Sequence, residues 1–215
     1  MKALPNGYFL TLEGIEGTGK TTQSEMLATE LQGEGYDVHA VREPGGTSLG
    51  EHVRQLTKHF YEGKPPVPMA ELLLMGASRA QLMSEVICRE LENGKIVICD
   101  RFADSTTVYQ GYGRKLPIEF IQYMHRVTLN QRWPDRTILL DLPPETGLKR
   151  AQDRNNDIED IFDNQDITFH RTIRQGFLDL AQENSHRIRI VNAERSPAEI
   201  KSEIRKIIEH DLNTL

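Results

Sequence analysis

Apolar residues along the chain form short continuous runs that alternate with longer amphipathic stretches. The runs are bounded by turn-forming or charged residues, which is typical of β-strands. They cover residues 8–13, 37–42, 95–100, 136–142 and 187–191. The run Ile96-Val97-Ile98-Cys99 is apolar throughout, and such runs indicate strands that are buried on both faces, as in a parallel sheet.

The stretches between these runs carry apolar residues at helical spacing. The longest covers about residues 69–92 and ends before Gly94, and glycine is common just after a helix. Strands that alternate with helices predict an α/β fold with a doubly wound parallel sheet flanked by helices. We expect a single domain over residues 1–215, because this length fits one such unit. Residues 152–166 interrupt the apolar pattern with acidic and amide side chains, so they are a candidate lid.

Composition narrows the class of partner. Hydrophobic residues make up 38% of the chain and charged residues 27%, a balance that predicts a globular protein. The formal net charge is −6, whereas binding to a polynucleotide backbone depends on an excess of Lys and Arg. We therefore expect no polynucleotide partner, and any anionic ligand must be held by a local cluster of donors.

The cysteines and the apolar runs predict where the protein works. Cys88 and Cys99 form neither a CxxC pair nor a disulfide framework, which fits a reducing compartment. The first apolar run, residues 8–12, is shorter than the core of a signal peptide, and no run approaches the ~18 residues that span a bilayer. We expect a cytoplasmic protein with no membrane partner.

Residues 14–21, directly after the first predicted strand, read Gly-Ile-Glu-Gly-Thr-Gly-Lys-Thr. They fit the phosphate-binding loop (P-loop) pattern G-x-x-x-x-G-K-[ST] in its required place between a strand and a helix. Its glycines let consecutive backbone N–H groups face an anion at a helix N-terminus. Lys20 would bridge the β and γ phosphates of ATP, and Thr21 would reach Mg²⁺. The predicted ATP-binding residues are Gly14, Ile15, Glu16, Gly17, Thr18, Gly19, Lys20, Thr21 and Thr22.

A second candidate, Asp100-Arg101-Phe102, ends the predicted strand 95–100. Ligands bind at the carboxyl edge of open α/β sheets, where this segment should lie. Asp100 is suited to holding Mg²⁺ through water, and Arg101 to holding a phosphate. An Asp-Arg pair by itself is more often a surface ion pair, so this prediction depends on the P-loop sharing the same edge.

Two further features leave alternatives open. Glu16 places a carboxylate in a phosphate-binding loop, where it would repel a triphosphate unless it points elsewhere. It either accepts a hydroxyl of a second substrate or is a solvated loop residue. Residues 42–47, Arg-Glu-Pro-Gly-Gly-Thr, predict a tight turn after the second strand. This turn either contacts a ligand or only connects two elements.

Taken together, these segments resemble thymidylate kinases of the bacterial type along nearly the whole chain. The motifs that carry the resemblance are Glu-Gly-Ile-Glu-Gly-Thr-Gly-Lys-Thr-Thr at 13–22, Arg-Glu-Pro-Gly-Gly-Thr at 42–47, Asp-Arg-Phe-Ala-Asp-Ser at 100–105 and Tyr-Gln-Gly-Tyr-Gly-Arg at 109–114. The resemblance implies a P-loop kinase fold with a five-stranded parallel sheet, and a homodimer. It also implies transfer of the γ-phosphate of ATP to dTMP with Mg²⁺, which gives ADP and dTDP for dTTP synthesis.

The resemblance assigns roles on the acceptor side. Glu16 would face the 3′-hydroxyl of the deoxyribose, and Tyr109 would wall off the sugar C2′ position. Arg42 and Arg101 would clamp the acceptor phosphate, since arginines bind a dianion in a bidentate manner.

The base-binding residues also come from the resemblance. Arg79 and Gln110 would lie along the thymine, and Thr106 would give it a hydrogen bond. Met75 stands where the family usually has a Phe that stacks on the base, so the ring would meet a flexible thioether.

A transition-state arginine is expected from the lid. Some members of the family carry an Arg in the P-loop after the acidic residue, but this chain has Gly17 there. Arg150 and Arg154 lie at the start of the lid, and Arg154 matches the catalytic position better. A second lid arginine further on is absent, and residues 160–163 depart from the usual lid sequence. The predicted catalytic residues are Lys20, Asp100, Arg101 and Arg154.

Two rival functions remain. The same P-loop would serve a kinase for another nucleoside or nucleoside monophosphate, although the motifs at 42–47 and 109–111 argue against it. A non-enzymatic nucleotide switch would use the loop only to sense nucleotide. The chain lacks an Asn-Lys-x-Asp guanine-reading motif, and a second-substrate pocket has no purpose in a switch.

Overall fold

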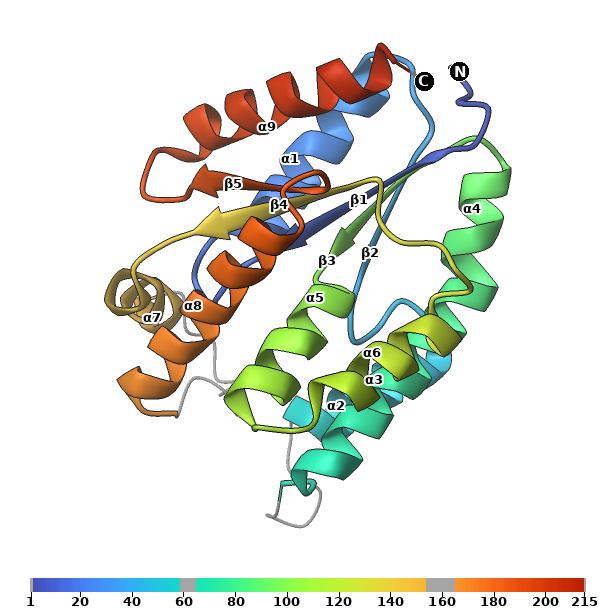
Figure 1. The fold of residues 1–215 in the computed structure, drawn as a ribbon. Coiled ribbons are helices and arrows are strands. Elements are labelled where there is room, and N and C mark those ends of the chain that lie inside the picture. The colour runs from blue at the N-terminus through green and yellow to red at the C-terminus, as the bar shows by residue number, and fades with distance from the viewer. Residues whose placement is uncertain (1, 59–64, 154–164, 215) are drawn as a thin grey trace.

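Five parallel strands form one sheet at the centre of the protein (Figure 1). The computed structural model describes residues 2–58, 65–153 and 165–214. The strands are β1 Tyr8–Glu13, β2 Val38–Arg42, β3 Ile96–Asp100, β4 Arg136–Asp141 and β5 Ile188–Asn192. Their order is β2-β3-β1-β4-β5, with Leu10 of β1 aligned with Ile98 of β3 and Arg136 of β4. The loops that follow β1, β2 and β3 therefore leave the same edge of the sheet beside one another.

The helices follow the predicted alternation. They are α1 Lys20–Gly33, α2 Ser48–Lys58, α3 Pro68–Leu82, α4 Cys88–Glu92, α5 Ala103–Thr106, α6 Ile118–Thr128, α7 Pro144–Asp153, α8 Ile167–Glu183 and α9 Pro197–Leu212, with π-helical turns η2 Met83–Ile87 and η3 Thr107–Gly113. The predicted helix 69–92 is confirmed as a continuous helical segment, in which η2 separates α3 from α4. All five predicted strands are confirmed, with ends that differ by one residue at most.

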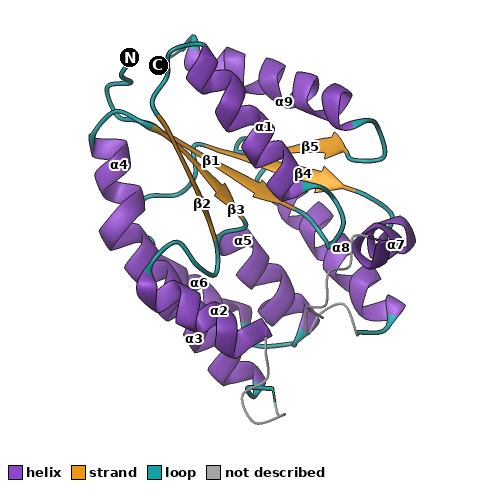
Figure 2. Cartoon of the chain, turned by 180° about the vertical axis from the view of Figure 1, so that it is seen from behind, coloured by secondary structure: helices purple, strands orange, loops and turns teal. Residues whose placement is uncertain are grey.

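Helices cover both faces of the sheet (Figure 2). Side chains alternate along β1, so that Tyr8, Leu10 and Leu12 enter the core beneath α1 and α9, whereas Phe9 enters the opposite core beneath η2 and α4. Every β1 residue is buried, as the continuous apolar run predicted. The doubly wound α/β fold class is therefore confirmed.

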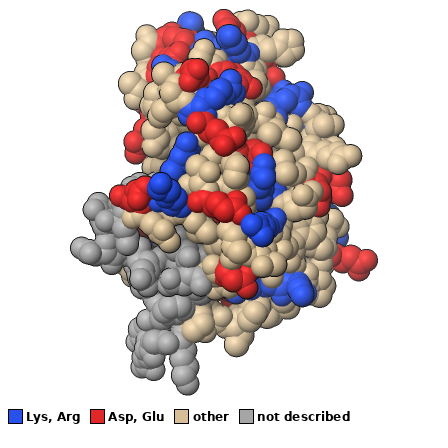
Figure 3. All heavy atoms as spheres, turned by 90° about the vertical axis from the view of Figure 1, so that its left-hand side faces the viewer, with Lys and Arg blue, Asp and Glu red and all other residues tan. Residues whose placement is uncertain are grey.

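Charges of both signs alternate on the described part of the face that lies at the left of Figure 1 (Figure 3). Two ion pairs link α8 to neighbouring elements, Arg171 to Glu145 at 2.6 Å and Arg174 to Asp141 at 2.8 Å. Among the described helices, none is long and apolar enough to cross a membrane. Cys88 and Cys99 are both unpaired, as predicted.

The predicted lid, residues 152–166, is only partly described. Its first two residues continue α7, so the helix extends further into this segment than the polar sequence suggested. At its other end, the Asp166 carboxylate accepts the Phe169 N–H at 2.8 Å and caps α8. Arg154 lies outside the described residues.

Candidate functional site

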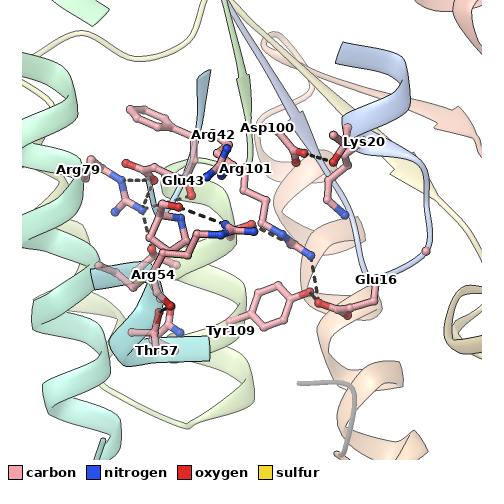
Figure 4. Close-up of a pocket in the computed structure, with 18 of the residues that line it drawn as sticks. Glu16, Lys20, Arg42, Glu43, Arg54, Thr57, Arg79, Asp100, Arg101 and Tyr109 are labelled. Atoms are coloured by element: carbon pink, nitrogen blue, oxygen red, sulfur yellow. Dashed lines mark hydrogen bonds and ion pairs between the residues drawn. The ribbon is translucent and has the colours of Figure 1, made fainter. Parts of the chain in front are cut away.

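A cavity of about 440 Å³ lies at the carboxyl edge of the sheet (Figure 4). Its walls come from the loops after β1, β2 and β3, from helices α1, α2, α3, α5 and α7, and from the turn η3. The lining residues are Glu16, Gly17, Gly19, Lys20, Thr21, Arg42, Glu43, Pro44, Arg54, Thr57, Met75, Arg79, Asp100, Arg101, Phe102, Ser105, Thr106, Tyr109, Gln110 and Ala151. The P-loop and the predicted acceptor residues thus share one cavity.

The P-loop curls between β1 and α1 as its glycines predict. Gly17 has a φ of 72°, and a Cβ there would lie 2.0 Å from the Gly147 carbonyl oxygen of α7. The loop therefore packs against α7 too closely for any side chain at this position. This contact gives a physical reason why position 17 is a glycine.

Lys20 lies in the first turn of α1 and is buried. Its Nζ donates to the carbonyl oxygens of Gly14 at 3.0 Å and Ile15 at 2.7 Å, and to Thr18 Oγ1 at 3.2 Å. Burial, together with the nearby Arg101 guanidinium, lowers the pKa of Lys20 to about 7. The ammonium is thus held by weak acceptors that a phosphate oxygen can replace.

The two predicted metal-binding residues lie next to each other. Thr21 Oγ1 donates to Asp100 Oδ2 at 2.6 Å, so the start of α1 meets the end of β3. Four of the predicted ATP-binding residues lie outside the cavity wall. Gly14, Ile15 and Thr18 shape the loop from behind, and Thr22 is exposed on α1.

Glu16 points away from the P-loop cradle, and the alternative of a solvated residue is wrong. Its side chain is 10% exposed. Oε1 accepts the Tyr109 hydroxyl at 2.6 Å and Arg101 Nη2 at 3.0 Å, and Oε2 lies 3.6 Å from His170 Nδ1. Burial alone would raise the pKa of Glu16, but His170, Arg101 and Lys20 bring it well below its ordinary value. Glu16 is therefore ionised.

Arg101 is held in an unusual backbone conformation, with a φ of 68°. The buried Glu13 carboxylate fixes this turn, because it accepts the Phe102 N–H at 2.8 Å and the Ser105 hydroxyl at 2.6 Å. Burial and the nearby Asp104 raise the pKa of Glu13 to about 7. Sequence reasoning missed Glu13, although its place directly before the P-loop was a usable signal.

Arg79 is buried at the far end of the cavity. Its Nε and Nη2 donate to Glu43 Oε2 at 3.0 and 2.8 Å, and Nη2 also donates to Thr106 Oγ1 at 2.7 Å. Glu43 belongs to the loop 42–47, which therefore both turns the chain and lines the cavity. The structure brings Arg79 and Thr106 together, as predicted, but sequence reasoning missed Glu43.

Arg42 lines the cavity but pairs with Glu51 at 2.8 Å rather than with another predicted site residue. Arg54 and Thr57 of α2 line the same wall and were also missed, and Arg54 Nη1 donates to the Pro44 carbonyl at 3.2 Å. Their spacing of three residues on an amphipathic helix was the available signal.

Helix α7 brings the start of the lid to the cavity. Ala151 lines the wall, whereas the Arg150 Nη1 donates to the Ala193 carbonyl oxygen at 2.8 Å, outside the cavity lining. Arg150 is thus engaged elsewhere in this structure.

Comparisons with known proteins agree on one family. The family model described as thymidylate kinase matches residues 12–204. The chain is 45% identical over 201 residues to a thymidylate kinase of Synechococcus sp. (strain JA-2-3B'a(2-13)), which covers 94% of both chains. It is 44% identical to a thymidylate kinase of Maridesulfovibrio salexigens, with 94% of this chain and 95% of that relative covered. The crystal structure of thymidylate kinase from Ehrlichia chaffeensis superposes with a TM-score of 0.77 at 33% identity, covering 95% of this chain and all of that one. The chain belongs to the thymidylate kinase family.

Proposed function

We propose that the protein is a thymidylate kinase that transfers the γ-phosphate of ATP to dTMP, giving ADP and dTDP for dTTP synthesis. The observation that carries this proposal is a single cavity lined by a P-loop and by four arginines, Arg42, Arg54, Arg79 and Arg101. Phosphoryl transfer needs a donor and an acceptor in line, with cations around the transferring group. A nucleotide switch has no need of such a second-substrate wall.

On the donor side, phosphate oxygens would replace the carbonyl oxygens that now accept from Lys20. The buried ammonium then faces a full negative charge, which is a stronger acceptor than a neutral carbonyl. The N–H groups of the loop and the N-terminus of α1 add positive potential at the same place. Lys20 would thus stabilise charge on the β and γ phosphates.

Thr21 and Asp100 fit a magnesium ion that accompanies ATP. They present a hydroxyl and a carboxylate oxygen 2.6 Å apart beside the phosphate loop, and hard oxygen donors suit Mg²⁺. The remaining ligands of the ion would be water and phosphate oxygens. When bound, Mg²⁺ neutralises charge on the β and γ phosphates.

On the acceptor side, Arg101 and Arg42 would bind the dTMP phosphate. Arg101 is rigid, since Nη1 donates to the Gly14 carbonyl at 3.0 Å and Nη2 to Glu16. The Arg42 side chain is half exposed, so it can exchange Glu51 for a phosphate. Glu16 and Tyr109 would lie along the sugar, with the Tyr109 ring closing the space near C2′.

The base would lie at the far end of the cavity, surrounded by Arg79, Thr106, Gln110 and Met75. Arg154 would supply the cation that the P-loop lacks at Gly17. Helix α7 supports this assignment, because Ala151, three residues before Arg154 in the sequence, lines the cavity wall, whereas Arg150 donates to the Ala193 carbonyl oxygen.

A homodimer is also proposed. Helices α3 and α6 pack together, and both expose apolar side chains at helical spacing, which are Met69 and Leu73 on α3 and Phe120, Tyr123 and Val127 on α6. An exposed apolar surface of this kind is typical of an interface. Light scattering after gel filtration tests it, and Tyr123→Arg should shift a dimeric mass to that of a monomer.

The activity is tested by ADP release with Mg²⁺ and ATP over dTMP, dUMP, CMP and AMP. A thymidylate kinase shows its highest kcat/KM with dTMP. Preference for CMP or AMP would favour the rival nucleotide kinase, and no acceptor-dependent ADP release would favour a switch.

A further inference from the structure

Gln110 carries its side chain in one fixed orientation. It lies on η3, is 3% exposed and lines the end of the cavity assigned to the base. Its Nε2 donates to Glu71 Oε1 at 2.6 Å. Glu71 belongs to α3, is 2% exposed and does not line the cavity. The contact therefore reaches Gln110 from behind the cavity wall.

The chemistry of Glu71 decides which end of the amide faces it. Arg114 Nη2 donates to Glu71 Oε2 at 3.3 Å, so the carboxylate has a cationic partner and stays an acceptor. An ionised carboxylate accepts hydrogen bonds but donates none. Only the NH₂ end of Gln110 satisfies it, which leaves the amide oxygen, Oε1, for the cavity.

Thr106 is held in a complementary way on the same wall. Its Oγ1 already accepts from Arg79 Nη2 at 2.7 Å, so its own hydrogen is available to a ligand acceptor. The wall thus presents an acceptor from Gln110 next to donors from Thr106 and Arg79. A thymine or uracil ring matches this pattern, because its N3–H donates and its two carbonyl oxygens accept. Cytosine presents an acceptor at N3 instead.

We infer that Glu71 is a positioning residue for base selection, which locks the Gln110 amide oxygen toward the cavity and so selects an imide pyrimidine over cytosine. The inference rests on the proposed function and adds a residue that never touches the nucleotide. Facing cytosine, Gln110 Oε1 would meet a lone pair and stay unpaired, and an unpaired buried polar group costs about 1–3 kcal/mol. Locking the amide therefore contributes roughly 5- to 150-fold to the preference for dTMP over dCMP.

The test compares kcat/KM for dTMP, dUMP and dCMP in the wild type, Glu71→Gln and Glu85→Gln. Glutamine at position 71 keeps the size of the side chain but offers either end of its amide, so Gln110 is no longer locked. We expect the ratio of kcat/KM for dTMP to that for dCMP to fall at least about fivefold, mostly through a higher KM for dTMP, with dUMP following dTMP. Glu85 lies on η2 and is exposed, so the loss of a negative charge there should leave the dTMP-to-dCMP ratio unaltered.

A second pair of variants separates positioning from a structural role. Gln110→Met should lower the same ratio, and Glu71→Gln added to Gln110→Met should change it no further, because Glu71 acts only through Gln110.

An unchanged ratio in Glu71→Gln or in Gln110→Met, or additive effects in the double variant, overturns the inference. If Glu71→Gln does not fold, an unchanged ratio in Gln110→Met still overturns the inference. A wild type that fails to phosphorylate dTMP overturns the proposed function and this inference with it, whereas an active wild type with an unchanged ratio in the variants overturns the inference alone.

Discussion

His125 should make the stability of the protein depend on pH between about 5 and 7. It lies on α6, is 1% exposed and is held between Thr107, whose Oγ1 is 3.0 Å from Nε2, and Arg79, whose Nη1 is 3.5 Å from Nδ1. Arg79 can only donate, so Nδ1 accepts and Nε2 carries the proton. Burial, followed by the Arg79 and Arg187 charges, lowers the pKa of His125 to about 3.

The lowered pKa of His125 determines the sign and size of the change in unfolding free energy with pH. An unfolded histidine has a pKa of ~6.5, so below that pH the unfolded state binds a proton that the folded state excludes. The contribution to stability is fully present above pH ~6.5 and is lost as the pH falls toward 3. Between pH 7 and pH 5 the loss amounts to about 2 kcal/mol, since an unfolded imidazole at pH 5 is protonated roughly 30-fold over neutral.

Urea unfolding at pH 5, 6 and 7, at one protein concentration, measures how the free energy of unfolding changes with pH in the wild type and in His125→Gln. Other groups titrate in this range, so the difference between the two pH slopes isolates His125. We expect His125→Gln to lose about 2 kcal/mol less than the wild type between pH 7 and 5. If the unfolding free energies of the wild type and His125→Gln depend on pH with the same slope, His125 is not held neutral in the folded protein. This conclusion holds whatever the absolute stability of the variant.

Three further predictions concern the reaction. Asp100→Asn should raise the Mg²⁺ concentration needed for half-maximal rate, because the amide keeps the shape of the carboxylate but lacks its charge. An unaltered Mg²⁺ titration would show that Asp100 has only a structural role. Arg154→Ala should lower kcat by at least about 100-fold, or ~2.7 kcal/mol of barrier, with dTMP affinity nearly unchanged, and Arg150→Ala should cost less. If steady-state kinetics show a larger loss of kcat in Arg150→Ala than in Arg154→Ala, the assignment of Arg154 as the catalytic arginine is wrong. Tyr109 should favour the deoxyribose form of the acceptor, and equal kcat/KM for the ribose form would remove this role.

Local patterns were enough to predict the sheet and the donor side of the site. The strand 95–100 and the glycines of residues 14–19 each carry their signal within a few neighbouring residues. Both segments end at the same sheet edge in any parallel α/β fold, so Asp100 and Thr21 were predicted to hold one Mg²⁺, and their side chains lie 2.6 Å apart.

Contacts that depend on packing between distant elements could not be predicted this way. Glu43 pairs with Arg79 across 36 positions, and Glu16 lies beside His170 across 154 positions. Such pairs depend on the angle at which two helices or a helix and a loop pack together, and no local spacing encodes that angle. The pairing of Arg42 with Glu51 shows the same limit, since Arg42 lines the cavity but its present partner was not predicted.

Transfer of a phosphoryl group from ATP to dTMP in the cavity can be measured directly. The most direct measurement incubates the protein with [γ-³²P]ATP, Mg²⁺ and dTMP and separates the products, with Lys20→Ala as the control. We predict label in dTDP that depends on both enzyme and dTMP, and that Lys20→Ala reduces the rate far more than it reduces dTMP affinity. Label that appears only as inorganic phosphate would show that the protein does not transfer the phosphoryl group to dTMP. Equal transfer by Lys20→Ala and the wild type would show that Lys20 does not act on the ATP phosphates.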